Sequence, residues 1–272
     1  MTPSLSLAGL HAHAASGAWT RGVRAAIGWA AETGFRRIHL DAAAPEIRPR
    51  VLDRSARRDL AATLRRESLG FTGLDLWIPS DHFADPAHAD RAHAALLGAV
   101  ELAADLRALT GGAGAPPVVS VTLPESYAGL PEAMAHADAL SMLVEDFGHA
   151  TDEIGAPAPE NAENEAANGG PQPGVPRPGV DTGRLLLRDR PPGKTFARCS
   201  KRAATLRLND ADDTGRRPIG AGRLEVHTLI ALHATLTPEL PIVTDLRGLD
   251  NPDRGARAAL DHLRDAGLPP LA

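Results

Sequence analysis

Short apolar runs alternate along the chain with longer segments in which apolar residues recur every three or four positions. A short apolar run bounded by turn residues is typical of a buried strand, and the three-to-four spacing predicts an amphipathic helix. Seven strands are predicted on this basis, within residues 4–10, 36–42, 71–79, 116–124, 179–187, 203–210 and 241–248. Helices are predicted at 20–34, 54–70, 86–112, 131–155, 224–237 and 253–267, with a short helix or turn at 193–202.

The alternation of strands and helices predicts a parallel sheet. A doubly wound sheet is one alternative, but the first strand-to-helix connection lacks the Gly-x-Gly-x-x-Gly loop that binds phosphate in that fold. The chain has 272 residues, which is a natural length for one α/β barrel. We therefore expect a single-domain (β/α)8-type TIM barrel spanning residues 1–272.

Residues 155–178 interrupt the alternation where a fifth strand and helix would be expected. The segment is rich in Pro and Gly, and it contains no aromatic residue and almost no branched aliphatic residue. Such a composition buries too little apolar area to offset the entropy of ordering the chain. It predicts a flexible insertion in a barrel that is irregular around strand and helix five.

Composition restricts the classes of function. The net charge is −5 and no basic run is dense enough to follow a phosphate backbone, so nucleic acid is not an expected partner. No apolar run approaches the ~18 residues of a membrane span, and the N-terminus lacks the basic leader of a signal peptide. We therefore expect a cytoplasmic protein with no membrane partner. Aromatic residues make up only 3% of the chain, which predicts a core of Leu, Val, Ile and Ala, and a single cysteine, Cys199, excludes an intrachain disulfide and a Cys-rich zinc site.

Five local motifs occur in an informative order. The first is "AAETGFRRIHLD", in which a helix, Gly-Phe and a strand end in the carboxylate of Asp41. The others are "VDTGR", "LRLND", "PIGAGRLEVHTLI" and "PIVTDLRG". Together these motifs resemble the xylose isomerase-like TIM barrels, which include sugar isomerases and epimerases and the endonuclease IV group. The resemblance covers most of the chain outside 155–178, and it implies a small carbohydrate-like ligand at the carboxyl ends of the strands.

The resemblance also implies a divalent-metal site, from which this chain departs. The family's ligands are a Glu after strand five, the Asp of an Asp-Thr-Gly-His motif, a His on strand seven and a Glu after strand eight. Asp181 matches the second ligand, while Arg184 replaces the His of that motif. Arg207 stands where the strand-seven His would be, and Asp245 stands in for the final Glu. No strand-five carboxylate is assigned, because the Pro/Gly-rich segment occupies that region.

An arginine keeps its proton in a protein, so Arg207 cannot ligate a metal and would repel one. We therefore expect no cofactor, and a divalent metal (Mn, Mg, Co or Zn) only if a site is retained through Asp181 and Asp245. In place of the metal, we expect Arg207 to balance charge by pairing with Asp181 and Asp245 in the barrel mouth. Such a network either binds an anionic or polyhydroxyl ligand or serves structure alone.

Residues at the strand ends should converge on the carboxyl face of the barrel, where such folds place their chemistry. His82 follows the third strand beside Asp81 and is the best candidate general base. The candidate catalytic residues are Asp181, Asp245 and His82, and the candidate substrate-binding residues are Asp41, Arg184, Arg207, Asp210, Arg247 and His11.

Three functions are consistent with these features. The first is a sugar isomerase- or epimerase-like barrel that has lost its metal site and acts on, or binds, a small carbohydrate or anionic ligand. The second is a non-catalytic barrel, a pseudoenzyme, that binds a ligand or a protein. The third is an endonuclease IV-like DNA repair enzyme, which the acidic net charge disfavours. The sequence leaves the oligomeric state open.

Overall fold

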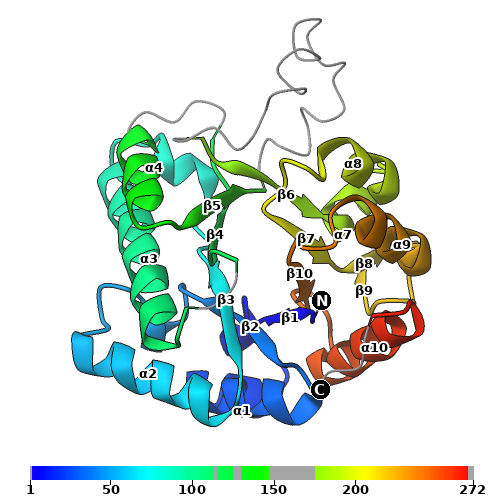
Figure 1. Cartoon of the computed structure of the whole chain (residues 1–272), viewed down its shortest axis with the longest axis horizontal. Helices are drawn as coiled ribbons and strands as arrows, with labels where there is room; N and C mark the ends of the chain where they lie inside the picture. The colour runs from blue at the N-terminus through cyan, green and yellow to red at the C-terminus, as the bar shows by residue number, and fades with distance from the viewer. Residues whose placement is uncertain (1, 113–114, 125–129, 148–174, 269–272) are drawn as a thin grey trace, which may run out of the picture.

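Eight parallel strands form a closed barrel surrounded by helices (Figure 1). The computed structural model describes residues 2–112, 115–124, 130–147 and 175–268. Around the barrel, the strands follow the order β1-β10-β7-β6-β5-β4-β3-β2. The predicted (β/α)8 TIM-barrel fold is confirmed.

The strands of the barrel are short, and each of the seven predicted strand segments overlaps one of them. The strands are β1 (Ser4–Ser6), β2 (Arg37–Asp41), β3 (Gly70–Asp75), β4 (Val118–Val121), β5 (Leu143–Asp146), β6 (Arg177–Asp181), β7 (Thr205–Leu208) and β10 (Ile242–Asp245). The helices are α1 (Val23–Thr33), α2 (Arg54–Arg66), α3 (Ala89–Leu109), α4 (Leu130–Ala139), α7 (Thr182–Leu186), α8 (Pro192–Cys199), α9 (Val226–Leu236) and α10 (Pro252–Asp265).

The hydrophobic core lies between the barrel wall and the surrounding helices. Helix α2 shows how the sequence builds this layer, since Asp53 caps the helix by accepting the N–H of Ala56, and Leu60 and Leu64 are buried on one face. Most buried apolar side chains are Leu, Val, Ile and Ala, as the composition predicts. Among the described helices, none is both long and apolar enough to cross a membrane. Cys199 is buried at the end of α8, and burial raises the pKa of its thiol to about 11.

The fifth strand lies inside a segment that the sequence analysis predicts to be helical. The predicted helix 131–155 is wrong between residues 140 and 147, because α4 ends at Ala139 and β5 follows at Leu143–Asp146, and residues 148–155 fall outside the described part of the chain. Ser141 has a positive φ of 55°, which breaks the helix. Most of the predicted insertion, 155–174, falls outside the described residues, while its last residues, Arg177 and Pro178, begin β6. The barrel is therefore complete at strand five.

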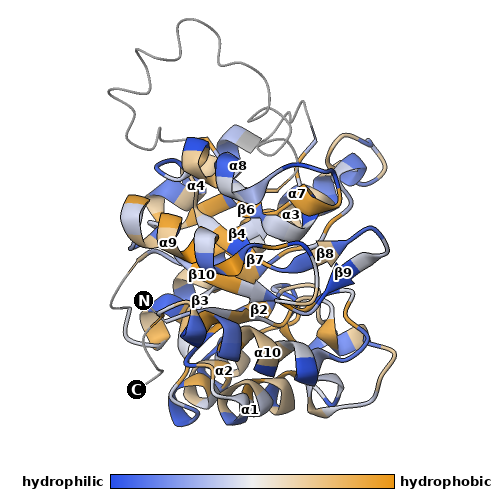
Figure 2. Cartoon of the chain, turned by 90° about the vertical axis from the view of Figure 1, so that its right-hand side faces the viewer, coloured by the Kyte–Doolittle hydropathy of each residue, from blue (hydrophilic) through white to orange (hydrophobic). Residues whose placement is uncertain are grey.

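A two-stranded hairpin follows β7, and the sequence analysis does not predict it. β8 (Asp210–Asp212) pairs antiparallel with β9 (Gly215–Arg217), and the two strands form a separate sheet. Asp212 accepts hydrogen bonds from the N–H and the hydroxyl of Thr214, which stabilises the turn. Figure 2 shows the hairpin as a largely hydrophilic arm beside the barrel. This arm carries Arg216 toward the mouth of the barrel.

The interior of the barrel is polar, whereas bulky branched apolar residues usually fill such interiors. Two glycines make room for the polar side chains. A methyl group at Gly73 would run into His39, and one at Gly179 would run into Phe147 and Glu145. The buried polar side chains of the barrel strands include Ser6, His39, Asp75, Ser120, Glu145, Thr205, Arg207 and Asp245, each at most 2% exposed.

The close packing at Gly73 leads to a stability prediction. Gly73→Ala should lower the free energy of unfolding by about 2 kcal/mol, because the added methyl group would clash with the carbonyl oxygen of Val118 and the ring of His39. Gly28→Ala, in α1, is the matched control, since a methyl group there meets no atom within 4 Å and Ala favours a helix. Urea unfolding measures both changes. Equal stability of Gly73→Ala and the wild type would contradict the prediction.

Candidate functional site

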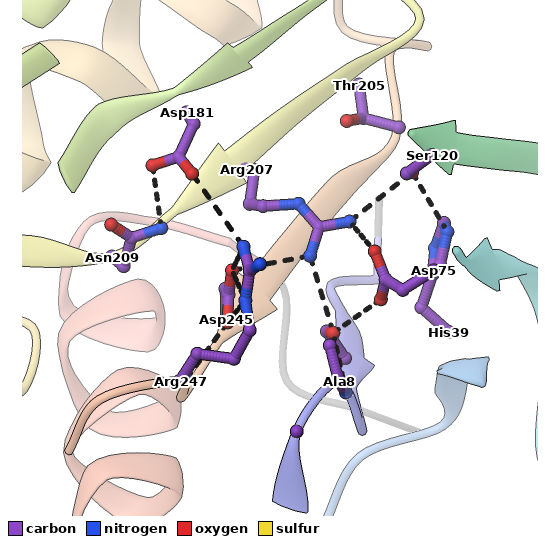
Figure 3. A network of polar contacts seen from close by, with 12 residues as sticks. Ala8, His39, Asp75, Ser120, Asp181, Thr205, Arg207, Asn209, Asp245 and Arg247 are labelled. Atoms are coloured by element: carbon purple, nitrogen blue, oxygen red, sulfur yellow. Dashed lines mark hydrogen bonds and ion pairs between the residues drawn. The ribbon is translucent and has the colours of Figure 1, made fainter. Parts of the chain in front are cut away.

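The interior of the barrel is spanned by the side chain of Arg207, which extends from β7 and is fully buried. Its Nη2 lies 2.5 Å from Oδ1 of Asp75 on β3, and its Nη1 lies 3.4 Å from Oδ2 of Asp245 on β10 (Figure 3). The hydroxyl oxygens of Ser6 and Ser120 lie 3.4 Å from these two nitrogens. Since β7 and β3 stand opposite each other in the barrel order, the guanidinium links opposite walls.

Burial and ion pairing oppose each other in this cluster. Burial lowers the pKa of Arg207, but the surrounding carboxylates, that of Asp75 foremost, outweigh burial and raise it. Burial raises the pKa of Asp245, but the three neighbouring guanidinium groups, that of Arg247 foremost, hold it well below its ordinary range. Burial also opposes ionisation of Asp75, yet Arg207 and further neighbours leave its pKa lowered. These groups therefore carry their charges at neutral pH.

Two further arginines lie on the solvent side of this buried pair. Arg216, on β9, lies 3.3 Å from Oδ2 of Asp181 and 3.4 Å from Oδ2 of Asp245. Arg247, just after β10, pairs with Asp245 and lies 3.9 Å from Oδ2 of Asp181. Both side chains are 19% exposed, whereas Arg207 has no exposed surface. We use the term mouth cluster for Asp75, Asp181, Arg207, Arg216, Asp245 and Arg247.

One of the two expected ion pairs of Arg207 is present and the other is not. Arg207 pairs with Asp245, but among the described residues no ion pair joins it to Asp181. Asp181 and Arg207 are neighbours across the β6–β7 register, so the long side chain of Arg207 reaches past Asp181 to Asp75 on the opposite wall. Asp181 instead accepts hydrogen bonds from Nδ2 of Asn209 and from the backbone N–H of Arg184 in α7.

Two aromatic rings contact guanidinium groups of the mouth cluster. The guanidinium carbon of Arg207 lies 4.9 Å from the centre of the Phe147 ring. Phe147 stacks against Trp77 with ring centres 6.3 Å apart, and Arg247 lies 3.5 Å from the centre of the Trp77 ring. The π faces of both rings therefore meet a cation, which is favourable for each pair.

The fifth strand carries a buried carboxylate, Glu145. Its side chain accepts hydrogen bonds from the hydroxyl groups of Ser120 at 2.8 Å and Thr205 at 2.5 Å. Burial raises the pKa of Glu145 to about 7, against the lowering effect of Arg207. The sequence analysis assigns no carboxylate to strand five because it places that strand within the Pro/Gly-rich segment, whereas β5 precedes the segment and carries Glu145. His39, also fully buried, stays neutral because burial lowers its pKa to about 4.

Three of the predicted site residues lie apart from the contacts of Arg207. Asp210 is buried and accepts the backbone N–H groups of Gly220 and Gly222, so it orders the loop before α9. Arg184 donates from Nη1 to the carbonyl oxygen of Phe147 at 2.5 Å. The ring of His82 packs against His88 with centres 4.4 Å apart, and among the described residues no hydrogen bond or ion pair joins it to the mouth cluster. The remaining predicted residues, His11 and Asp41, form a pair at the first two strand ends.

The His11–Asp41 pair is held by backbone groups. Nδ1 of His11 lies 3.1 Å from Oδ2 of Asp41. Asp41 also accepts the N–H groups of Gly9 at 2.8 Å and Ala43 at 2.9 Å. Burial raises the pKa of Asp41 above its ordinary value, although these hydrogen bonds act in the opposite direction. The two side chains line a cavity beside the barrel mouth.

The metal site implied by the resemblance does not fit the side chains at the corresponding strands. Glu145, Asp181, Arg207 and Asp245 stand on β5, β6, β7 and β10. A guanidinium has no lone pair to offer an ion, and here it also occupies the space between the carboxylates. Among the described residues, no group of three or more His, Cys, Asp or Glu side chains could hold a metal ion.

Comparisons with known proteins show a shared fold. A D-psicose 3-epimerase, solved in the presence of D-fructose, matches with a TM-score of 0.68 and 12% identity over 98% of this chain and 99% of that one. A xylose isomerase-like protein from Mycobacterium smegmatis, in complex with magnesium, matches with a TM-score of 0.67 and 15% identity over 100% and 98%. The fold is that of the xylose isomerase-like TIM barrels.

A third solved structure of this barrel type, a sugar phosphate isomerase/epimerase from Parabacteroides distasonis, matches with a TM-score of 0.61 and 11% identity over 97% of this chain and 94% of that one. No protein-family model matches the sequence. No curated protein matches it either. The xylose isomerase-like resemblance read from five sequence motifs is thus confirmed at the level of the fold.

Several residues around Arg207 escape the sequence analysis. Ser120 is the single polar residue of an otherwise apolar strand and Asp75 is the single charged residue of its strand, a signal that points into a barrel interior. Glu145 follows the apolar pair in "LVED", and Arg216 follows "DDTG", a turn signal between two polar runs. Each of these sequence signals predicts a residue of the site only once the position of its strand is known.

Removing the central guanidinium should destabilise the fold. Arg207→Met should lower the free energy of unfolding by about 3–5 kcal/mol, because Asp75 and Asp245 would keep buried charges without their partner. Adding Asp75→Asn to that variant should recover part of the loss. The control is Arg24→Ala, which breaks an exposed pair with Asp59 and should cost less than about 1 kcal/mol. Urea unfolding gives these values, and similar losses for both arginines would contradict the assignment.

Glu145 should make the stability depend on pH. Because its pKa is raised from 4.5 to about 7, its contribution to stability is fully present below pH 4.5 and is lost as the pH rises through 7. Between pH 5 and pH 8 the wild type should lose about 2 kcal/mol of unfolding free energy relative to Glu145→Gln. Chemical unfolding across this range measures the difference. Glu239→Gln, at an exposed position, should track the wild type, and parallel curves for Glu145→Gln and the wild type would refute the prediction.

Proposed function

We propose that this chain binds a small carbohydrate or sugar acid at the carboxyl end of its barrel, with the guanidinium of Arg207 in place of a divalent metal. The observation that carries the proposal is the fully buried ion pairing of Arg207 with Asp75 and Asp245. A permanent cation in this position supplies the positive charge that the carboxylates need, and it leaves no room for a metal ion among them.

The outer arginines support a polyhydroxyl or singly anionic ligand. The mouth cluster holds three guanidinium groups and three carboxylates, so it is close to neutral. Its exposed donors belong to Arg216 and Arg247, whose planar forks suit carboxylate and vicinal hydroxyl oxygens. The solved structures of similar fold include proteins named as sugar epimerases and isomerases, which agrees with a carbohydrate-sized ligand.

A second candidate function is catalysed proton transfer on such a ligand, as in an isomerase or epimerase. Glu145 favours it, because a carboxyl group with a pKa of about 7 exchanges protons readily at neutral pH. Arg207 would then stabilise the negative charge that develops on a substrate oxygen. Both groups are fully buried, so the substrate would reach them only if the side chains that cover them moved. Binding without catalysis needs no such movement and is the simpler proposal.

A nuclease of the endonuclease IV type has less support. It needs a cluster of His and carboxylate ligands for three metals, and the described residues offer no group of that kind. The net charge of −5 also disfavours binding to a phosphate backbone.

Binding of D-gluconate and D-fructose tests the proposal directly. Titration calorimetry should show both sugars binding to the wild type, with affinities unchanged by chelators. Arg247→Ala should weaken gluconate binding about tenfold and fructose binding less, because a charge-assisted hydrogen bond to the carboxylate is lost. Arg257→Ala removes an exposed arginine of α10 and serves as the matched control, with no change in either affinity.

Metal binding provides the opposing outcome. One equivalent of tightly held Mn, Mg, Co or Zn in the purified wild type would contradict the proposal, as would sugar binding that depends on such an ion. Arg207→His should raise the affinity for Mn²⁺, since an imidazole can ligate where a guanidinium cannot. Failure of both sugars to bind the wild type would equally reject the proposed ligand class.

A further inference from the structure

A cavity of about 220 Å³ lies beside the first two strand ends, separate from the mouth cluster. None of the mouth-cluster residues lines it. Its inner wall is apolar and buried, with Leu10, Ala26, Ala44 and Ile47 contributing. Apolar cavities of about 150 Å³ already hold a benzene-sized molecule, so this volume suits a single substituted ring.

Two side chains in the wall of the cavity, His11 and Trp19, each offer a ring nitrogen to which an oxygen atom of a ligand could hydrogen-bond. The side chain of His11 lines the cavity and is 31% exposed, and its Nδ1 is engaged by Asp41. In the neutral ring this bond places the proton on Nδ1 and leaves Nε2 as an acceptor. Trp19 also lines the cavity, and its Nε1 is buried without a hydrogen-bond partner among the described residues. A buried donor without a partner destabilises the protein until an acceptor is supplied.

The charges around the cavity disfavour an anion. Asp41 lies in its wall and Glu46 at its rim, and no Lys or Arg side chain lines it. Glu46 accepts the N–H of Val23 at the start of α1, which holds the carboxylate at the rim. A ligand with a carboxylate or phosphate group would meet two like charges here.

We propose that this cavity is a second ligand site, which takes a small uncharged molecule with an apolar ring and one hydroxyl group. The hydroxyl group donates to Nε2 of His11 and accepts from Nε1 of Trp19. The ring packs against Leu10, Ala26 and Ile47. A phenol has this combination of one donor–acceptor oxygen and a flat apolar body.

Three ring compounds of similar size separate the contributions of the hydroxyl group and of the ligand's charge to binding. p-Cresol should bind the wild type and change the fluorescence of Trp19, with ligand-observed NMR as a second readout. p-Xylene, which lacks the hydroxyl group, should bind about five- to tenfold more weakly. 4-Methylbenzoate, an anion of the same shape, should bind more weakly still. Absence of p-cresol binding, equal binding of p-xylene, or tighter binding of 4-methylbenzoate would each overturn the proposal.

Variants locate the binding in this cavity. Ala26→Leu fills the space and should weaken p-cresol binding more than tenfold, whereas Ala25→Leu, on the same helix outside the lining, should leave it unchanged. Ala44→Leu is a second filling variant that keeps the test decisive if Ala26→Leu does not fold. His11→Phe should reduce the preference for p-cresol over p-xylene, because only the hydrogen bond from Nε1 of Trp19 would remain. Unchanged p-cresol binding in both filling variants would place the site elsewhere and refute the assignment.

Discussion

The fold is organised around one buried cation held between opposite walls of the barrel. Taking the guanidinium of Arg207 and the carboxylate of Asp75 out of water is expensive, and their attraction offsets that cost only with close geometry and further hydrogen bonds. The 2.5 Å contact between Arg207 and Asp75 supplies the close geometry. The further hydrogen bonds come from a second carboxylate, that of Asp245, and from the hydroxyl groups of Ser6 and Ser120. The polar barrel interior follows from this requirement.

A fixed guanidinium and a bound metal ion solve the same electrostatic problem with different chemistry. Both neutralise carboxylates gathered at the ends of neighbouring strands. A metal exchanges ligands and polarises a substrate oxygen directly, whereas both Nη atoms of Arg207 are engaged by side chains of the protein itself and its guanidinium lies against the ring of Phe147. Contact with an incoming molecule therefore passes to Arg216 and Arg247 on the solvent side. Under the proposed function, the guanidinium of Arg207 supports the site and those of Arg216 and Arg247 contact the ligand.

The sequence predicts the barrel and the position of its central arginine more reliably than it predicts which side chains contact that arginine. Seven strands carry clear apolar runs, and Arg207 is recognisable because it interrupts one of them. β5 is missed because it has four residues and begins soon after α4 ends at Ala139. The turn between them, where Ser141 has a positive φ, contains no Gly or Pro that would mark it in the sequence. The partner of Arg207 on the far wall, Asp75, is 132 positions away, and pairing across a closed barrel depends on register that no local pattern contains.

The hairpin formed by β8 and β9 places one guanidinium of the site on a part of the chain that is not a wall strand. Its two strands hydrogen-bond only with each other as a sheet, so the barrel ladder does not depend on them. Arg216 thus reaches Asp181 and Asp245 from the second strand of the hairpin rather than from a strand of the barrel wall. Asp210 and Ala211 of β8 are buried in the core, whereas β9 is partly exposed, so protein engineers could vary the turn and β9 to alter ligand preference while β8 keeps its place.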